Sequence, residues 1–194
     1  VHATAGLARV RGAYGDLRGA ASLYEHAARR LPSPDFVAAL GDVYARLADG
    51  ERAEQQYALV GAMQRLLAAS GVRTEIDLAL FAADHARDLE ASLAATRAEY
   101  AERRSVHVAD ALAWAEYRMG HLAAARAHSR EALRLGTKDP LLLYRAGVIA
   151  HAAGDTEAAY TLLRRSHDLN PAFSLLFADD LAARLELLAA ARAP

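Results

Sequence analysis

The sequence predicts an all-α protein built as an array of antiparallel helix pairs, and two observations carry that prediction. Alanine supplies about a quarter of the 194 residues, hydrophobic types reach 54%, and glycine and proline number only 12 and 5. Such a composition favours helices whose backbones pack closely. The second observation is a pattern of similar residues that returns about every 34 positions, which is typical of stacked helix pairs.

The repeat is clearest in a series of alanines. Consecutive members stand 33, 38, 34 and 34 positions apart, and they are Ala20, Ala53, Ala91, Ala125 and Ala159. Five copies in register divide the chain into units of approximately 1–33, 34–71, 72–105, 106–139 and 140–172. A helix pair has an apolar face too large to bury alone, so each unit should cover its neighbour. We therefore expect residues 1–194 to form a single repeat domain.

Local signals for helix ends agree with these units. Asp139 followed by Pro140 is typical of an N-cap with proline at the first helical position, and Thr74 with Asp77 fits a capping box. Glycines stand where the first helix of a unit must end, at Gly15, Gly120 and Gly154.

Two departures from the regular spacing predict additional helix. The long step of 38 indicates about one extra helical turn between Tyr57 and Gly71. After Pro171, leucines at helical spacing predict a capping helix over 174–191, which would cover the last repeat or contact a downstream domain. These leucines are Leu181, Leu185 and Leu188.

The unit resembles the tetratricopeptide repeat, which carries a small residue where its two helices meet, a large residue four positions later and a closing proline. Matching residues include the small residues Gly41, Ala113 and Gly147 and the closing Pro171, while the large residue Tyr44 follows Gly41 after three positions. The third unit departs from the family pattern, with Ala86 and Arg103 where glycine and proline are expected. The resemblance covers essentially the whole chain. It implies a right-handed superhelical α-solenoid of about five repeats plus the capping helix.

Composition excludes several classes of function. The formal charge is −1, from 23 basic and 24 acidic residues, so nucleic acid is not expected as a partner. Cysteine is absent, which removes disulfides, thiolate chemistry and cysteine-based zinc sites. No apolar run suits a membrane span, so we expect a soluble protein without membrane insertion. The compartment stays open, with the cytoplasm favoured. Because the chain starts at Val1, any targeting segment is expected outside it.

No motif whose spacing encodes a mechanism is present, so we predict a protein that is not an enzyme and needs no cofactor or metal. Two weaker constellations have simpler readings. One has the residue types of a metal site on a helix surface, where solvated charges are the usual explanation: Asp84, His85 and Asp88. The other has the types of a catalytic triad, but its serine precedes a helix and fits an N-cap: Ser105, His107 and Asp110.

The family resemblance implies that positions 2, 5, 9 and 12 of each unit line a concave groove that faces a ligand. In the third unit this face starts at Arg73. In the fourth and fifth units it is rich in aromatic residues, and with the neighbouring Arg118 it forms our candidate peptide-binding site: His107, Asp110, Trp114, Tyr117, Arg118, Tyr144, Val148 and His151. Large aromatic residues and arginine dominate binding hot spots. The alternative is that these rings fill the interface between the two repeats.

We therefore predict a scaffold module that holds a protein or peptide partner in its groove, with the partner's identity open. One alternative is a structural module that self-associates into a homo-oligomer. Another is a regulatory or docking domain of a larger enzyme or transcription regulator. The full-length reading frame would discriminate this last alternative from the others.

Overall fold

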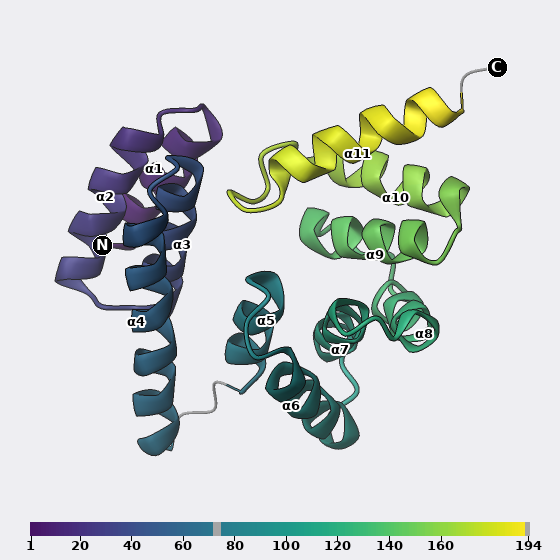
Figure 1. Ribbon diagram of the computed structural model, residues 1–194, viewed down its shortest axis with the longest axis horizontal. Coiled ribbons are helices and arrows are strands. Elements are labelled where there is room, and N and C mark those ends of the chain that lie inside the picture. The colour runs from purple at the N-terminus through teal and green to yellow at the C-terminus, as the bar shows by residue number, and fades with distance from the viewer. Residues whose placement is uncertain (72–74, 193–194) are drawn as a thin grey trace. The chain divides into compact units, whose positions relative to one another are not determined.

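The computed structural model describes residues 1–71 and 75–192. Within these ranges the secondary structure is entirely helical, joined by turns, so the predicted all-α class is confirmed. In chain order the helices are α1 (His2–Ala13), α2 (Leu17–Arg30), α3 (Pro34–Arg46), α4 (Gly50–Ala69), α5 (Glu75–Asp84), α6 (Leu89–Glu102), α7 (Val106–Arg118), α8 (Leu122–Ala132), α9 (Pro140–Ala152), α10 (Thr156–Leu169) and α11 (Ala178–Ala191) (Figure 1).

The helices belong to two compact units, which are described separately. The first unit holds α1 to α4, with Ser174–Leu176 assigned to it, and the second holds α5 to α11. In both units, consecutive helices pack as pairs, from α1 with α2 to α9 with α10. In the second unit the first helices of the pairs, α5, α7 and α9, also contact one another in that order. That the chain forms a single domain stays a prediction.

Helix caps follow the sequence signals. The Asp139 side chain accepts a hydrogen bond from the backbone nitrogen of Leu141 at 2.8 Å, which confirms the predicted N-cap of α9. Ser105 accepts a hydrogen bond from the backbone nitrogen of Val108 at 3.2 Å, so it caps α7 as expected. The capping box that begins at Thr74 lies outside the described residues.

The turn inside each helix pair needs one residue in the left-handed region. The three predicted glycines occupy it, with φ of 84° at Gly15 and 80° at both Gly120 and Gly154. Alanine takes the equivalent place in the other two pairs, with φ of 59° at Ala48 and 55° at Ala86. A residue with a Cβ pays about 1–2 kcal/mol for this conformation. The geometry of the pair therefore overrides the preference of the residue.

The extra residues of the second unit of sequence lengthen a helix. Helix α4 has 20 residues, whereas α2, α6, α8 and α10 have 11 to 14. The predicted additional turn between Tyr57 and Gly71 is therefore an extension of α4. None of the helices in the described part of the chain combines the length and apolar character that a membrane crossing requires.

The C-terminal helix differs from its prediction at one end. It begins at Ala178 instead of near residue 174, and it packs against α10. The preceding residues 170–177 form turns. The Asn170 side chain accepts a hydrogen bond from the backbone nitrogen of Ala172 at 3.0 Å, which starts a turn at Pro171 and delays the helix.

Small residues let the paired helices approach closely. A Cβ added to Gly147 on α9 would lie 2.6 Å from Cγ of Leu163 on α10. A Cβ on Gly41 of α3 would lie 2.5 Å from a ring carbon of Tyr57 on α4. Neither space can hold a methyl group, so the two glycines are required by packing rather than by backbone conformation.

We expect Gly147→Ala to destabilise the protein by about 1–3 kcal/mol, because overpacking outweighs the higher helix propensity of alanine. Gly61→Ala in α4 is the matched control. Its Cβ would meet only the end of the Arg65 side chain at 3.4 Å, so this variant should be neutral or up to about 1 kcal/mol more stable. Urea unfolding followed by circular dichroism measures both. Equal effects of the two changes would contradict the packing argument.

Candidate functional site

Five aromatic side chains gather where α7 and α9 meet the chain before α11, and we call them the aromatic cluster. Trp114 stacks on Tyr117 with ring centroids 5.0 Å apart, and it meets Phe177 edge-on at 5.9 Å. Tyr144 stacks on Phe177 at 5.0 Å and contacts Phe173 at 5.5 Å. These distances and angles are those of favourable aromatic pairs. The cluster thus joins two helix pairs to the C-terminal segment.

Most of the aromatic cluster is inaccessible to a partner. Trp114 and Tyr144 are each 2% exposed, and Phe173 and Phe177 are also buried. Tyr117 alone is half-buried. The indole nitrogen of Trp114 is buried without a hydrogen-bond partner among the described residues. Phe173 and Phe177 were not among the predicted site residues, although two of the four phenylalanines stand four positions apart directly after Pro171.

The hydroxyl of Tyr144 anchors the C-terminal helix. It donates a hydrogen bond to Oδ2 of Asp180 on α11 at 2.7 Å, and the same carboxylate pairs with Arg184. Burial raises the pKa of Tyr144 above its ordinary value, and the hydrogen bond to Asp180 raises that pKa further. The folded state therefore favours the neutral phenol over the phenolate.

A buried ion cluster lies beside the rings and connects α5, α7 and α9. The Arg145 guanidinium, whose side chain is 3% exposed, donates to Oδ2 of Asp110 at 2.8 Å and to both carboxylate oxygens of Asp84 at 3.0 Å. Burial raises the pKa of Asp110, although Arg145 opposes that shift. Burial acts against the charge of Arg145, but Asp84 and Asp110 outweigh it and raise the pKa of the guanidinium.

Two arginines also lie over the indole ring. The Cζ atoms of Arg145 and Arg118 are 5.6 and 5.7 Å from the ring centroid of Trp114. Arg118 is half-buried, and its Nη1 donates to the backbone oxygen of Asp84 at 3.3 Å. In the described residues no carboxylate pairs with Arg118. It therefore keeps donors that an acidic or carbonyl group could accept.

Comparison with known proteins rests on structure alone. No family model and no curated protein matches the chain. Among the solved structures that match, three crystal structures cover nearly all of the chain. The chain has the tetratricopeptide repeat fold.

The first of these structures is a tetratricopeptide repeat protein from Parabacteroides merdae ATCC 43184, with a TM-score of 0.63 and 17% identity over 96% of this chain and 70% of that one. The second is a thermophilic tetratricopeptide repeat protein of Thermus thermophilus, with a TM-score of 0.60 and 15% identity over 97% and 98%. The third is PilW, described as a widely conserved type IV pilus biogenesis factor, with a TM-score of 0.54 and 13% identity over 98% and 90%.

The predicted groove positions fall into three classes of exposure. The buried ones are Asp110, Trp114, Tyr144 and Val148. Tyr117 and His151 are half-buried, as is Arg118, which follows Tyr117 in the sequence. His107 is exposed. Arg73 lies outside the described residues. An open aromatic anchor at Trp114 and Tyr144 is therefore not what the structure contains, because Phe173 and Phe177 cover those rings.

The two weaker constellations are not assembled as sites. Asp84 pairs with Arg145, and Nδ1 of His85 lies 2.8 Å from the backbone oxygen of Phe81. Ser105 caps α7, while Asp110 is occupied by Arg145. Asp84, His85, Ser105 and Asp110 therefore serve separate structural contacts.

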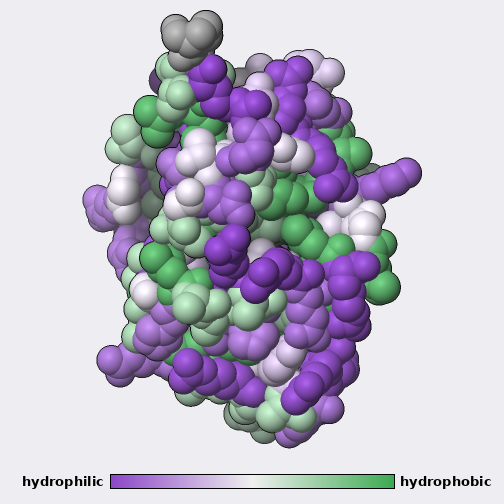
Figure 2. Space-filling model, turned by 90° about the vertical axis from the view of Figure 1, so that its right-hand side faces the viewer, coloured by the Kyte–Doolittle hydropathy of each residue, from purple (hydrophilic) through white to green (hydrophobic). Residues whose placement is uncertain are grey.

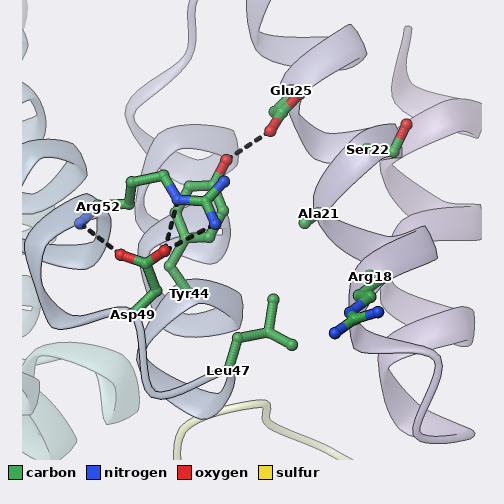
Figure 3. A pocket seen from close by; sticks show the side chains of 8 residues that line it. All are labelled: Arg18, Ala21, Ser22, Glu25, Tyr44, Leu47, Asp49 and Arg52. Atoms are coloured by element: carbon green, nitrogen blue, oxygen red, sulfur yellow. Dashed lines mark hydrogen bonds and ion pairs between the residues drawn. The ribbon is translucent and has the colours of Figure 1, made fainter.

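A shallow pocket in the first unit offers a second possible site, between α2, α3 and α4 (Figure 3). There the Tyr44 hydroxyl donates to Glu25 at 2.5 Å, and Arg52 lies over the Tyr44 ring while it pairs with Asp49. Figure 3 shows Arg18 apart from this bonded group. Glu25, Asp49 and Arg52 already have hydrogen-bond or ion-pair partners, so these three groups have little free capacity to bind a charged ligand.

Surface hydropathy adds no large docking area on the face that is drawn. Figure 2 shows hydrophobic residues in separate groups among hydrophilic ones. Scattered apolar residues of this kind are ordinary on a protein surface.

We expect Arg145→Met to destabilise the second unit by about 3–5 kcal/mol, because it leaves Asp84 and Asp110 without their buried partner. Arg126→Met is the matched control. It removes an ion pair with Asp155 between side chains that are 45% and 35% exposed, so it should change stability by less than about 1 kcal/mol. Thermal unfolding measures both variants, and a similar small effect for Arg145→Met would contradict the role of the ion cluster.

The raised pKa of Tyr144 predicts a pH dependence. A raised folded-state pKa means that the stabilising contribution is complete below the ordinary pKa of 10.0 and is lost as pH rises above it. The stability of wild type relative to Tyr144→Phe should therefore fall by about 1.4 kcal/mol per pH unit above pH 10. Urea unfolding across this range tests it. Tyr14→Phe, at a position 88% exposed, is the control for removing a tyrosine hydroxyl that is not buried.

Proposed function

We propose that this chain is a scaffold that binds a protein or peptide partner and catalyses no reaction itself. The observation that carries the proposal is the half-buried surface formed by Tyr117 and Arg118 at the end of α7, with His151 at the matching position of α9. We call it the contact surface. The tetratricopeptide repeat fold supports the proposal, because arrays of helix pairs commonly serve as interaction scaffolds.

The contact surface has the chemistry of a binding hot spot. The ring of Trp114 is buried and fixed, so Tyr117 and Arg118, which contact it, are held with little conformational freedom. Tyr117 can give apolar area and a hydroxyl, and Arg118 can give a planar set of donors. This combination favours a segment that carries an aromatic or aliphatic residue next to a carboxylate.

We expect Tyr117→Ala combined with Arg118→Ala to lose the partner while the fold remains, because both side chains are partly exposed and Trp114 stays in place. The measurement is selection of a display library of random peptides on the immobilised chain. Peptides enriched by wild type should not be enriched by the double variant. A loss of at least about tenfold in affinity is expected for two hot-spot residues.

The matched control is Tyr14→Ala combined with Arg30→Ala, which removes the same two residue types from exposed positions of the first unit. It should select the same peptides as wild type. Identical selection by the Tyr117 and Arg118 variant would reject the contact surface, and failure of wild type to select any peptide would reject peptide binding altogether.

Self-association stays a prediction, and so does a docking role within a larger protein. One observation favours self-association. Helix α1 and its C-cap residue expose an apolar stripe at helical spacing, in which Leu7, Val10 and Tyr14 are 48%, 50% and 88% exposed. A rise in molar mass with concentration in light scattering would support it.

A further inference from the structure

The aromatic cluster contains a contact that resembles a bound ligand. Trp114 and Tyr144 project from α7 and α9, which lie side by side, and both rings meet the single ring of Phe177. Phe177 belongs to neither helix pair, since it directly precedes α11. The ring of Phe177, which comes from outside the repeats, therefore packs against one predicted groove residue from each of two neighbouring repeats, Trp114 and Tyr144.

Two further residues complete this arrangement. Phe173 adds a second ring against Tyr144, and Asp180 accepts the hydrogen bond from the Tyr144 hydroxyl. Read along the chain, the segment presents the pattern Phe-x-x-x-Phe-x-x-Asp over residues 173–180. Its first part, residues 173–177, forms a bend and a turn rather than a helix of the array. Aromatic anchors with one acidic group are a common composition for a peptide that binds an amphipathic surface.

We infer that the α7–α9 surface is a docking site for a partner segment with the pattern Phe-x-x-x-Phe-x-x-Asp, and that the chain's own Phe173, Phe177 and Asp180 occupy it until such a partner displaces them. The inference rests on the proposed scaffold function and names the class of partner. In the complex, the two partner rings would pack on Trp114 and Tyr144, and the partner carboxylate would accept from the Tyr144 hydroxyl.

The occupied state has a quantitative consequence. A segment attached to the same chain competes at a high effective concentration, so an external segment binds with an affinity reduced by the fraction of open molecules. Weakening the internal segment should therefore strengthen binding of the external one. An ordinary structural cap would show no such compensation.

The test uses the full chain and a synthetic peptide of residues 170–184. In the Phe173→Ala and Phe177→Ala double variant, Trp114 loses the ring that covers it and its emission should shift to longer wavelength. Trp114 is the only tryptophan, so the signal has one source. Titration with the peptide should reverse the shift, with a Kd at least about tenfold lower than for wild type.

Two controls make the test specific. The first is the same peptide with Phe177→Ala, which should bind the open variant at least about tenfold more weakly, since one ring meets both groove positions. The second is the chain variant Leu187→Ala, which changes a side chain of α11 that is 60% exposed. It should bind the peptide no better than wild type does.

The outcomes divide cleanly. If the open variant keeps its helical circular dichroism and does not bind the peptide, or binds both peptides equally, the inference is wrong. If the double variant loses helicity, the milder Phe177→Leu variant replaces it, and loss of helicity there too would show that the rings are an indispensable part of the core. That result also overturns the inference.

Failure here differs from failure of the proposed function. Peptides selected on the chain and lost with the Tyr117 and Arg118 variant would still establish a scaffold, whatever the synthetic peptide does. Conversely, a chain that selects no peptide but whose open variant binds residues 170–184 would have an internal contact without an external partner, which rejects the docking site.

Discussion

Both units depend on one constraint, the close approach of paired helices. At the points of contact there is room only for alanine or glycine. Ala20, Ala125 and Ala159 are fully buried, and Gly41 and Gly147 leave no room for a methyl group. Small residues bury little apolar area themselves. Their contribution is to bring large neighbours such as Leu163 into contact with the opposite helix. The fold therefore depends more on the absence of bulk at a few positions than on particular large side chains.

Close packing also explains how the second unit tolerates charges in its interior. With α5, α7 and α9 side by side, one arginine can reach carboxylates on both other helices. Three charges are taken out of water, which is costly unless each is paired with good geometry. Arg145 thus links α9 to both α5 and α7, which belong to different helix pairs. The glycine contacts, in contrast, set only the distance between the two helices of one pair. The aromatic cluster includes rings from α7 and α9, and the ion pair between Arg145 and Asp110 holds these two helices together.

The helix pairs could be predicted because their signals are local or periodic. Asp139 caps α9 through its own neighbours, and the alanine series marks one position in each pair. The surroundings of Trp114 could not be predicted in this way. A repeat position indicates the side of the array that a residue faces, but not what lies over it, and the covering ring of Phe177 comes from outside the five units.

The Arg145 bridge was missed for a related reason. It follows Tyr144 directly, and one step along a helix turns the side chain by about 100°, out of the predicted stripe. Its partners Asp84 and Asp110 lie far away in sequence. The sequence placed Asp84 in a possible metal group, and it placed Asp110 both in a possible catalytic group and in the predicted groove. Opposite charges on different repeats carry no periodic signal, so their pairing became visible only once three helices were placed together.

Left-handed backbone at residues other than glycine affects the order in which the array forms. The turn between α5 and α6 holds two non-glycine residues in this region, Ala86 with φ of 55° and Asp88 with φ of 39°. The turns that contain Gly120 and Gly154 carry no such cost. In an array whose neighbours fold by propagation, nucleation is therefore favoured in the α7–α8 and α9–α10 hairpins, and the α5–α6 hairpin is added to that template. The same hairpin is where native-state hydrogen exchange would reveal the lowest opening free energy of the second unit.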